Sequence, residues 1–205
     1  MAKRRALALL LCFSFVASRT LLVADQERFG NPTAGISIAP PAGWHVMSMQ
    51  QVLDNRAKVR VPDERLQAGL QSATAPLFVF AKYSEPHAGL NPTIQVVLRP
   101  RPASLPESAT AILAATVPTL QRTFPDFRFV ESIRATDVAG MPAATMRTTY
   151  TLRTAAGGAH KVLARTWLVP RGQFMFLIGM SGTVDGEDVA ESEFTTALAS
   201  IAIDR

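Results

Sequence analysis

The chain has 205 residues, and its formal net charge is +5. Hydrophobic residues make up 48% and charged residues 18%, a globular composition that argues against a collagenous, coiled-coil or disordered chain. The single cysteine, Cys12, excludes an intrachain disulfide and a thiolate metal cluster.

The N-terminus is predicted to be a secretion signal. The basic segment 3–5 precedes an apolar run at 6–17, which is shorter than the roughly 20 residues that a membrane span needs. Small residues place signal cleavage at the end of 1–18, with 1–24 and a retained N-terminal anchor as the alternatives. A leucine directly before Cys12 argues against a lipoprotein, because lipidation follows cleavage after a small residue.

Removal of residues 1–18 changes what the charge implies. Three cations leave with the signal, so the net charge falls from +5 to +2. That charge is no electrostatic footprint for nucleic acid. No later run of 18 or more apolar residues predicts a transmembrane span in the mature chain. We therefore expect a periplasmic or secreted protein without a nucleic-acid partner.

The first part of the mature chain is predicted to contain one strand and two helices. Residues 19–34 are polar and are expected to form an irregular lead-in, and alternation at 35–39 predicts a strand before the turn at 40–43. A capping box predicts a helix at 49–58, because its serine and glutamine can satisfy each other's backbone donors. Proline followed by two acids predicts a second helix at 62–73.

Two strands and a longer helix are expected next. Aromatic and β-branched residues predict a strand at 77–83, and alternation predicts another at 93–99. Ser104 and Glu107 form a second capping-box pattern, which predicts a helix to residue 122. Pro118 is expected to kink or split that helix, because proline has no backbone donor.

The second half is predicted to be a run of strands followed by a closing helix. Turn residues separate its segments, and the last strand is apolar on both faces, so we expect cover on both sides. The expected strands are 127–135, 144–153, 160–169 and 173–181, and the closing helix is 185–200.

These elements predict an α+β fold. Strands joined by short turns are antiparallel, and helices must cover their apolar faces. We therefore expect an antiparallel β-sheet flanked by helices in an α/β/α sandwich. Residues 35–205 are predicted to form this single domain.

The segment 35–44 reads Gly-Ile-Ser-Ile-Ala-Pro-Pro-Ala-Gly-Trp, which resembles the "strand, Pro, Gly-Trp" opening of PsbP-like and DcrB-like proteins. The Asp-Val-Ala-Gly-Met-Pro-Ala turn at 137–143 and the pattern of long strands and a C-terminal helix are also similar, so the likeness covers about 29–203. The resemblance implies an α/β/α sandwich and a binding or assembly role. It offers no shared catalytic residues and no cofactor to carry over.

Catalytic and metal motifs are largely absent. His45, His87 and His160 have no metal-ligand spacing, which favours isolated histidines over a metal site. Ser181 lies in a segment similar to the Gly-x-Ser-x-Gly elbow of hydrolases, but Thr183 stands where that elbow needs glycine. A strand end is therefore the preferred interpretation, and a hydrolase with a non-contiguous site is kept as an alternative.

One group of side chains is a candidate binding site. Matching the apolar stripes of strands 144–153 and 160–169 places four cations and one aromatic on the opposite face. We predict a docking face there for an anionic partner, such as a headgroup, an acidic polymer or an acidic protein. The alternative is a solvated face, or one paired with acids of the closing helix. The predicted residues are Arg147, Arg153, Lys161, Arg165 and Trp167.

These observations predict a non-catalytic binding or assembly factor in the cell envelope, with no cofactor and no metal. An enzyme would need a site gathered from distant residues. A lipid-binding carrier is the third possibility, and it requires an apolar cavity between sheet and helix.

Overall fold

The structure is a computed structural model that describes residues 27–184 and 191–204. The predicted secretion signal, 1–18 or 1–24, lies outside these residues, as does the start of the predicted closing helix at 185–190. The described helices are α1 (Met49–Lys58), α2 (Glu64–Gln71), α3 (Ala109–Thr123) and α4 (Glu191–Ser200).

The strands form two antiparallel sheets. The small sheet contains β1 (Phe29–Asn31), β2 (Ile36–Ile38) and β11 (Ala202–Ile203). The large sheet contains β3 (His45–Val46), β4 (Val59–Arg60), β5 (Phe78–Ala81), β6 (Thr93–Pro100), β7 (Arg128–Val138), β8 (Met141–Thr154), β9 (Ala159–Arg171) and β10 (Phe174–Thr183). Its order is β3-β5-β6-β10-β9-β8-β4, and β7 also pairs with β8.

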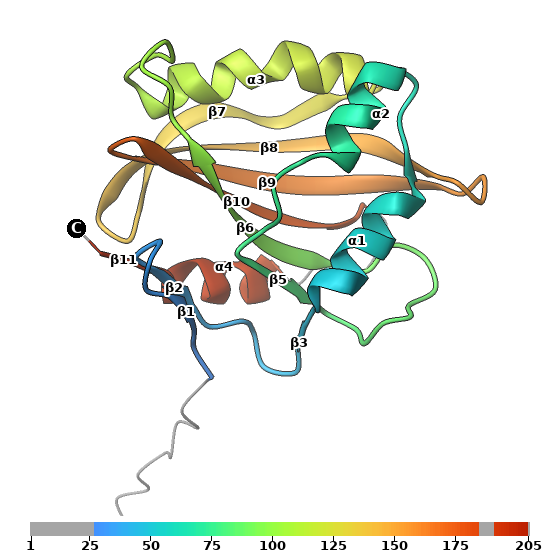
Figure 1. Cartoon of the computed structure of the whole chain (residues 1–205), viewed down its shortest axis with the longest axis horizontal. Coiled ribbons are helices and arrows are strands. Elements are labelled where there is room, and N and C mark those ends of the chain that lie inside the picture. Colours follow the sequence, from blue (N-terminus) through green and yellow to red (C-terminus); the bar gives the residue numbers. More distant parts are fainter. Residues whose placement is uncertain (1–26, 185–190, 205) are drawn as a thin grey trace, which may run out of the picture.

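The large sheet lies between two layers (Figure 1). Helix α3 covers one face, and α4 with the small sheet covers the other, so the predicted sandwich is confirmed. The central strand β10 shows why both layers are needed. Its Phe176 and Ile178 are fully buried on the α4 side, while Met175 and Leu177 pack against the α3 cluster. Burial of both faces agrees with the expectation from its apolar pattern.

Helix α1 begins where the capping box predicts. The Gln51 backbone N–H donates to the Ser48 hydroxyl at 3.2 Å, and the Ser48 N–H donates to Gln51 Oε1 at 2.8 Å. Asp63 caps α2 in the same way by accepting from the Leu66 N–H. Both helices therefore start at residues whose side chains satisfy otherwise unpaired donors.

Helix α3 starts later than predicted. The capping box at Ser104 is wrong, and Ser108 is the cap, since its hydroxyl accepts from the Ala111 N–H. Leu105 precedes Pro106, and a residue before proline is biased away from helical angles. Arg101 also donates to the Pro106 and Glu107 carbonyls, which holds this segment outside the helix.

Pro118 does not split α3, which runs as one helix from Ala109 to Thr123. Proline removes the hydrogen bond to the carbonyl four residues earlier, at Ala114. Ala114 and Pro118 are both exposed, so water can satisfy the freed carbonyl.

The sequence did not reveal four short strands, β1, β3, β4 and β11. Each has two or three residues and no alternating apolar pattern like the one that marked β2. The expectation of an irregular lead-in is wrong for Phe29–Asn31, which pairs with β2. Strand β4 has the largest effect on the charge of the sheet surface, because it adds a cation to the edge of β8.

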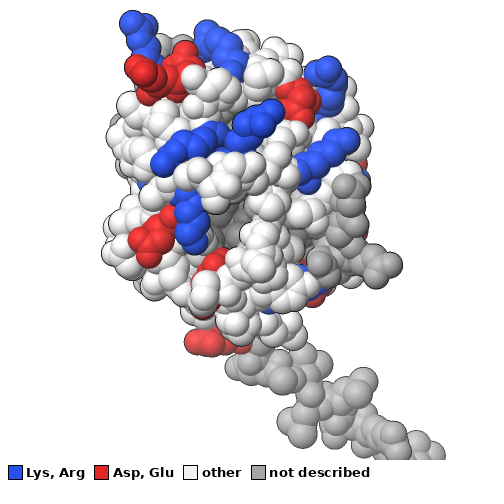
Figure 2. Space-filling view, turned by 90° about the vertical axis from the view of Figure 1, so that its right-hand side faces the viewer, with Lys and Arg blue, Asp and Glu red and all other residues white. Residues whose placement is uncertain are grey.

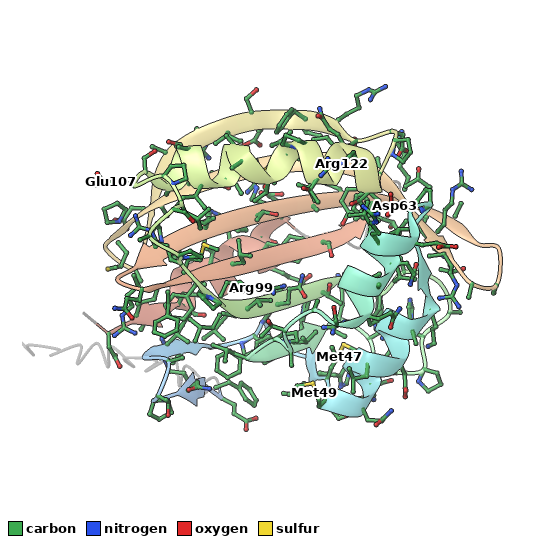
Figure 3. All side chains as sticks on the ribbon, turned by 45° about the horizontal axis from the view of Figure 1, so that its top comes forward. Met47, Met49, Asp63, Arg99, Glu107 and Arg122 are labelled. Atoms are coloured by element: carbon green, nitrogen blue, oxygen red, sulfur yellow. The ribbon has the colours of Figure 1, made fainter. Side chains whose placement is uncertain are left out.

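Figure 3 shows how α3 lies relative to the sheet face beneath it. Glu107 lies before its N-terminal end, Arg122 near its C-terminal end, and Arg99 on the neighbouring part of the sheet. Arg99 pairs with Met175 and therefore points to the α3 side of β6. Its neighbour Leu98 points to the opposite side, where it packs against the α4-side core.

Tyr150 offers a pH-dependent test of the packing on β8. Its ring stacks on Phe124 with centroids 4.2 Å apart, and burial raises the pKa of Tyr150 to about 12. The only other tyrosine is Tyr83. In Tyr83→Phe we expect the remaining phenol to titrate near 12, measured by ultraviolet absorbance.

The unfolded phenol loses its proton near pH 10, whereas the folded one keeps it to about 12. The stabilising effect of the half-buried Tyr150 phenol is therefore complete below pH 10 and is lost as the pH rises to 12. The loss is at most about 3 kcal/mol. Titration near pH 10 with an unchanged circular-dichroism spectrum would contradict this packing.

Candidate functional site

The β8–β9 pairing determines which predicted site residues meet. Arg147 lies directly opposite Arg165, and Trp167 lies opposite Thr145. Farther toward the hairpin turn, Lys161 lies opposite Thr151 and Arg153 opposite Ala159. Side chains alternate along a strand, so all five predicted residues share one face. The register nevertheless separates them into two groups.

Arg147 and Arg165 form the first group, and the fold neutralises it. Glu131 of β7 contacts Arg147 at 3.4 Å and Arg165 at 3.2 Å. Glu191 of α4 contacts Arg147 at 3.6 Å and also pairs with Arg165. Two cations therefore share two acids, and one of these acids comes from the closing helix. This arrangement matches the alternative in which the cations pair with that helix.

Trp167 belongs to the same group but is not open to a partner. Its side chain is only 4% exposed and is part of the core between the sheet and α4. The Arg165 guanidinium carbon lies 5.7 Å from the ring centroid, within the range of a cation–π contact. The Trp167 ring thus contacts Arg165, one of the two arginines of the ion-pair cluster.

The neutralised group predicts a stability effect. Glu131→Ala leaves Glu191 as the one described acid that pairs with the two opposed arginines. Arg147, Arg165 and Glu191 are all half-buried or exposed. We expect a loss of about 1–2 kcal/mol in the free energy of unfolding, measured with urea.

A suitable control is Glu107→Ala, since Glu107 forms no ion pair within the described part of the chain. Equal stabilities of the two variants would show that Glu131 does not hold the arginines.

The second group contains Arg153 and Lys161, and the structure adds Arg60 to it. Arg60 of β4 lies directly opposite Arg153 of β8, so their side chains share one face. Lys161 of β9 lies diagonally across from Arg153 on the same face. We call Arg60, Arg153 and Lys161 the cation strip. All three are exposed, and none forms an ion pair with any described residue.

Arg60 is partly held in place by the end of α1. Its Nη1 donates to the carbonyls of Ala57 and Val59 at 2.8 and 3.1 Å, and its other donors have no bond within the described residues. The sequence offered no signal for Arg60, because a two-residue strand between helices shows no alternation.

The acid beside the cation strip, Asp126, forms hydrogen bonds to the edge of the sheet. Asp126 fills the gap on the β8 edge between β7 and β4, where it accepts the Thr151 N–H at 3.0 Å and the Thr151 hydroxyl at 2.6 Å. These bonds from Thr151 lower the pKa of Asp126, and the charge of Arg128 adds to the effect. Thr151 donates to both carboxylate oxygens, so Asp126 satisfies a backbone N–H at the edge of β8 that neither β7 nor β4 pairs with.

Figure 2 faces the end of the molecule that carries α1, α2 and the β8–β9 hairpin turn. Lys and Arg side chains cross the middle of this face. The strip belongs to this end, since Arg60 follows α1 and Arg153 lies one residue before the end of β8.

The residues considered for catalysis have ordinary surroundings. Ser181 lies within β10, not at its end, and its hydroxyl contacts the Thr93 hydroxyl at 3.1 Å, which is no general base. His87 stacks on Tyr83 with centroids 4.7 Å apart. Among residues 27–184 and 191–204, no three His, Cys, Asp or Glu side chains are arranged to hold a metal. No helix in these ranges is long and apolar enough to cross a membrane.

A cavity of the kind that a lipid carrier requires is present, but in another place. A pocket of about 690 Å³ lies between the small sheet and the end of the large sheet, and not between sheet and helix. Its walls include Leu77, Leu98, Phe174 and Phe176, and Arg171 lines it as well.

Comparison with known proteins finds similarity in structure only. No protein-family model matches the sequence, and no curated protein is similar to it. The cyanobacterial PsbP of Synechocystis sp. PCC 6803 superposes with a TM-score of 0.53, at 14% identity over 87% of this chain and 92% of its own. The fold is PsbP-like. LpqN of Mycobacterium tuberculosis, which is involved in cell envelope biogenesis, superposes with a TM-score of 0.52, at 15% identity over 83% of each chain.

The PsbP-like fold confirms the resemblance drawn from the Gly35–Trp44 opening. In the structure this segment is β2 followed by a turn, in which the Trp44 N–H donates to the Pro41 carbonyl. Trp44 then meets Phe194 of α4 edge to face, with centroids 5.9 Å apart. The motif therefore joins the start of the domain to its last helix. At such low identity the PsbP-like fold brings no residue roles with it.

Proposed function

We propose that the protein is a non-catalytic binding or assembly factor of the cell envelope, and that it docks an acidic protein surface on the cation strip. The observation that carries this proposal is the direct opposition of Arg60 and Arg153 without an acid between them in the described part of the chain. The predicted secretion signal supports the location in the envelope.

Like charges directly opposite on neighbouring strands destabilise a sheet. Two pairs of arginines lie directly opposite each other on one face of the large sheet, Arg147 with Arg165 and Arg60 with Arg153. Two glutamates form ion pairs with the first pair, whereas no described residue forms an ion pair with the second. Lys161 adds a third positive charge nearby. Because no described residue supplies counter-charges to Arg60 and Arg153, we infer that a partner supplies them.

The chemistry of the strip favours a protein over a membrane surface. Two of its three cations are arginines, whose planar guanidinium binds carboxylates through two parallel hydrogen bonds. The adjacent hairpin turn is Ala155, Ala156, Gly157 and Gly158, which offers no large apolar or aromatic anchor for a bilayer. Attraction of three cations to anionic lipids would contribute only about 1 kcal/mol each.

A docking strip that opposes folding predicts a stabilising mutation. Arg153→Glu places an acid directly opposite Arg60 and diagonal to Lys161. We expect the free energy of unfolding to rise by about 0.2–1 kcal/mol, measured with urea at low salt, and the gain to shrink as salt is added. A loss of stability would show that Arg153 is a structural residue.

The docking role is tested by charge reversal. Reversing Arg147 and Arg165 would disturb the contact with α4, so the test uses Arg153→Glu with Lys161→Glu. Arg65→Glu with Arg122→Glu is the matched control, because it changes the net charge equally on exposed helix positions. Each protein is used to capture partners from envelope extract, which are then identified by mass spectrometry.

We expect the same acidic protein to be captured by the wild type and by the control, and at least about tenfold less of it by the strip variant. Binding of both variants at the wild-type level would overturn the proposal. Loss of binding to anionic vesicles alone, with no protein partner affected, would assign the strip to lipid instead.

A further inference from the structure

The pocket at the other end of the large sheet combines apolar walls with one cation that has no ion-pair partner among the described residues. Phe176 forms a fully buried part of the wall, and Leu98 lies directly opposite it on β6. Phe174 lies two residues before Phe176 on β10, on the same face, and is 49% exposed. A half-exposed phenylalanine above a pocket of about 690 Å³ leaves apolar surface that a ligand can cover.

Arg171 is placed at this pocket by the backbone of the small sheet. Its Nη1 donates to the Ala34 carbonyl at 2.7 Å. Its guanidinium lies so close to Gly35 that a Cβ there would come within 2.7 Å of Nη1. Gly35 also has a φ of +62°, which favours glycine. The close approach therefore fixes the guanidinium against the β1–β2 turn.

Most of the hydrogen-bonding capacity of Arg171 is unused. A guanidinium carries five N–H donors, and within the described residues Arg171 forms one hydrogen bond and no ion pair. Two polar side chains, Asn31 and Thr33, line the same pocket. The Asn31 carbonyl oxygen accepts the Ala34 N–H, which leaves its amide group as a further donor.

We propose that this pocket binds an amphipathic anion with one apolar chain, whose charged head pairs with Arg171 and whose chain lies along Leu77, Leu98 and Phe174. The site is separate from the cation strip and does not depend on the proposed docking function. It follows from the juxtaposition of an apolar cavity with a guanidinium that is held in place by Ala34 and forms no ion pair with any described residue.

The dimensions agree with a single-chain ligand. The volume of about 690 Å³ lies within the roughly 300–1,000 Å³ typical of small-molecule pockets. A second hollow of about 600 Å³ shares Gly172 and Phe174 with the first, so both hollows border the β9–β10 turn. A neutral apolar ligand would leave the guanidinium without a counter-charge in a partly dry site, and that is unfavourable. A cationic ligand would be repelled.

The charge of the head is the feature to test. Purified protein is titrated by calorimetry with laurate, dodecyl phosphate, dodecyl maltoside and dodecyltrimethylammonium, all below their micellar concentrations. We expect saturable one-to-one binding of the two anions, at least about tenfold weaker binding of the maltoside, and no binding of the cation. The ratio of laurate to dodecyl phosphate affinity separates a fatty-acid source from a phosphorylated one.

Two variants and one control locate the site. Arg171→Gln should weaken laurate binding about tenfold or more and abolish the preference for anionic heads. Phe174→Ala should weaken all single-chain ligands by about fivefold to tenfold and keep the preference for anions. Because Phe174 is half-exposed, this variant remains informative if Arg171→Gln does not fold. Arg99→Gln is the control, since Arg99 is on β6 beside Leu98 but points to the opposite face.

Equal affinity for the four head groups would overturn the proposal. Laurate binding that is unchanged in both Arg171→Gln and Phe174→Ala would also overturn it, because the ligand would then bind elsewhere. An absence of saturable laurate and dodecyl phosphate binding to the wild type would do the same.

Discussion

The register of β8 against β9 is the constraint on which the charge pattern of this protein depends. A shift by two residues would keep every side chain on its face, yet it would no longer place Arg147 opposite Arg165. That opposition creates a local excess of positive charge on the sheet. The excess requires Glu131 and Glu191 beside it, and Glu191 is the first described residue of α4. The position of the closing helix is thus coupled to strand pairing.

The same sheet face treats equivalent charges differently along its length. Near α4, cations and acids alternate across neighbouring elements, and Trp167 underlies them as part of the core. Toward the hairpin turn the sheet continues beyond α4, and its cations have no such partners among the described residues. Both groups lie on the same face of β8 and β9, so the contrast depends on which acids the neighbouring elements supply. An acid opposite Arg60 or Arg153 would stabilise this pairing, and neither position carries one.

The sequence predicted the start of a helix well where a side chain forms hydrogen bonds to the backbone of nearby residues. The Ser48 cap is an example, because its partners lie within one helical turn. The Ser104 pattern failed for a reason of similar range, since Pro106 restricts the residue before it. Alternation also placed the site cations on one face. It did not determine the register, which depends on contacts between distant parts of the chain.

Only some residues of the candidate sites could therefore be predicted from the sequence. Arg153 and Lys161 were found by parity, but Arg60 was not, because β4 exists only through its pairing with β8. Trp167 was expected beside an open face, and it is buried because α4 packs over that part of the sheet. Arg171 gave no signal at all. Its proposed role depends on Gly35, which is far away in sequence and is brought into contact by the small sheet.

The length of β9 has a consequence for how the molecule can work. This strand runs without interruption from Ala159 to Arg171, carrying Lys161 near its first end and Arg171 at its last. At about 3.3 Å per residue, these two side chains start roughly 33 Å apart. One continuous strand therefore connects the proposed acid-binding strip to the proposed amphiphile pocket over a distance greater than the width of a small ligand. If both sites are occupied, the two bound partners lie at opposite ends of β9 and do not obstruct each other.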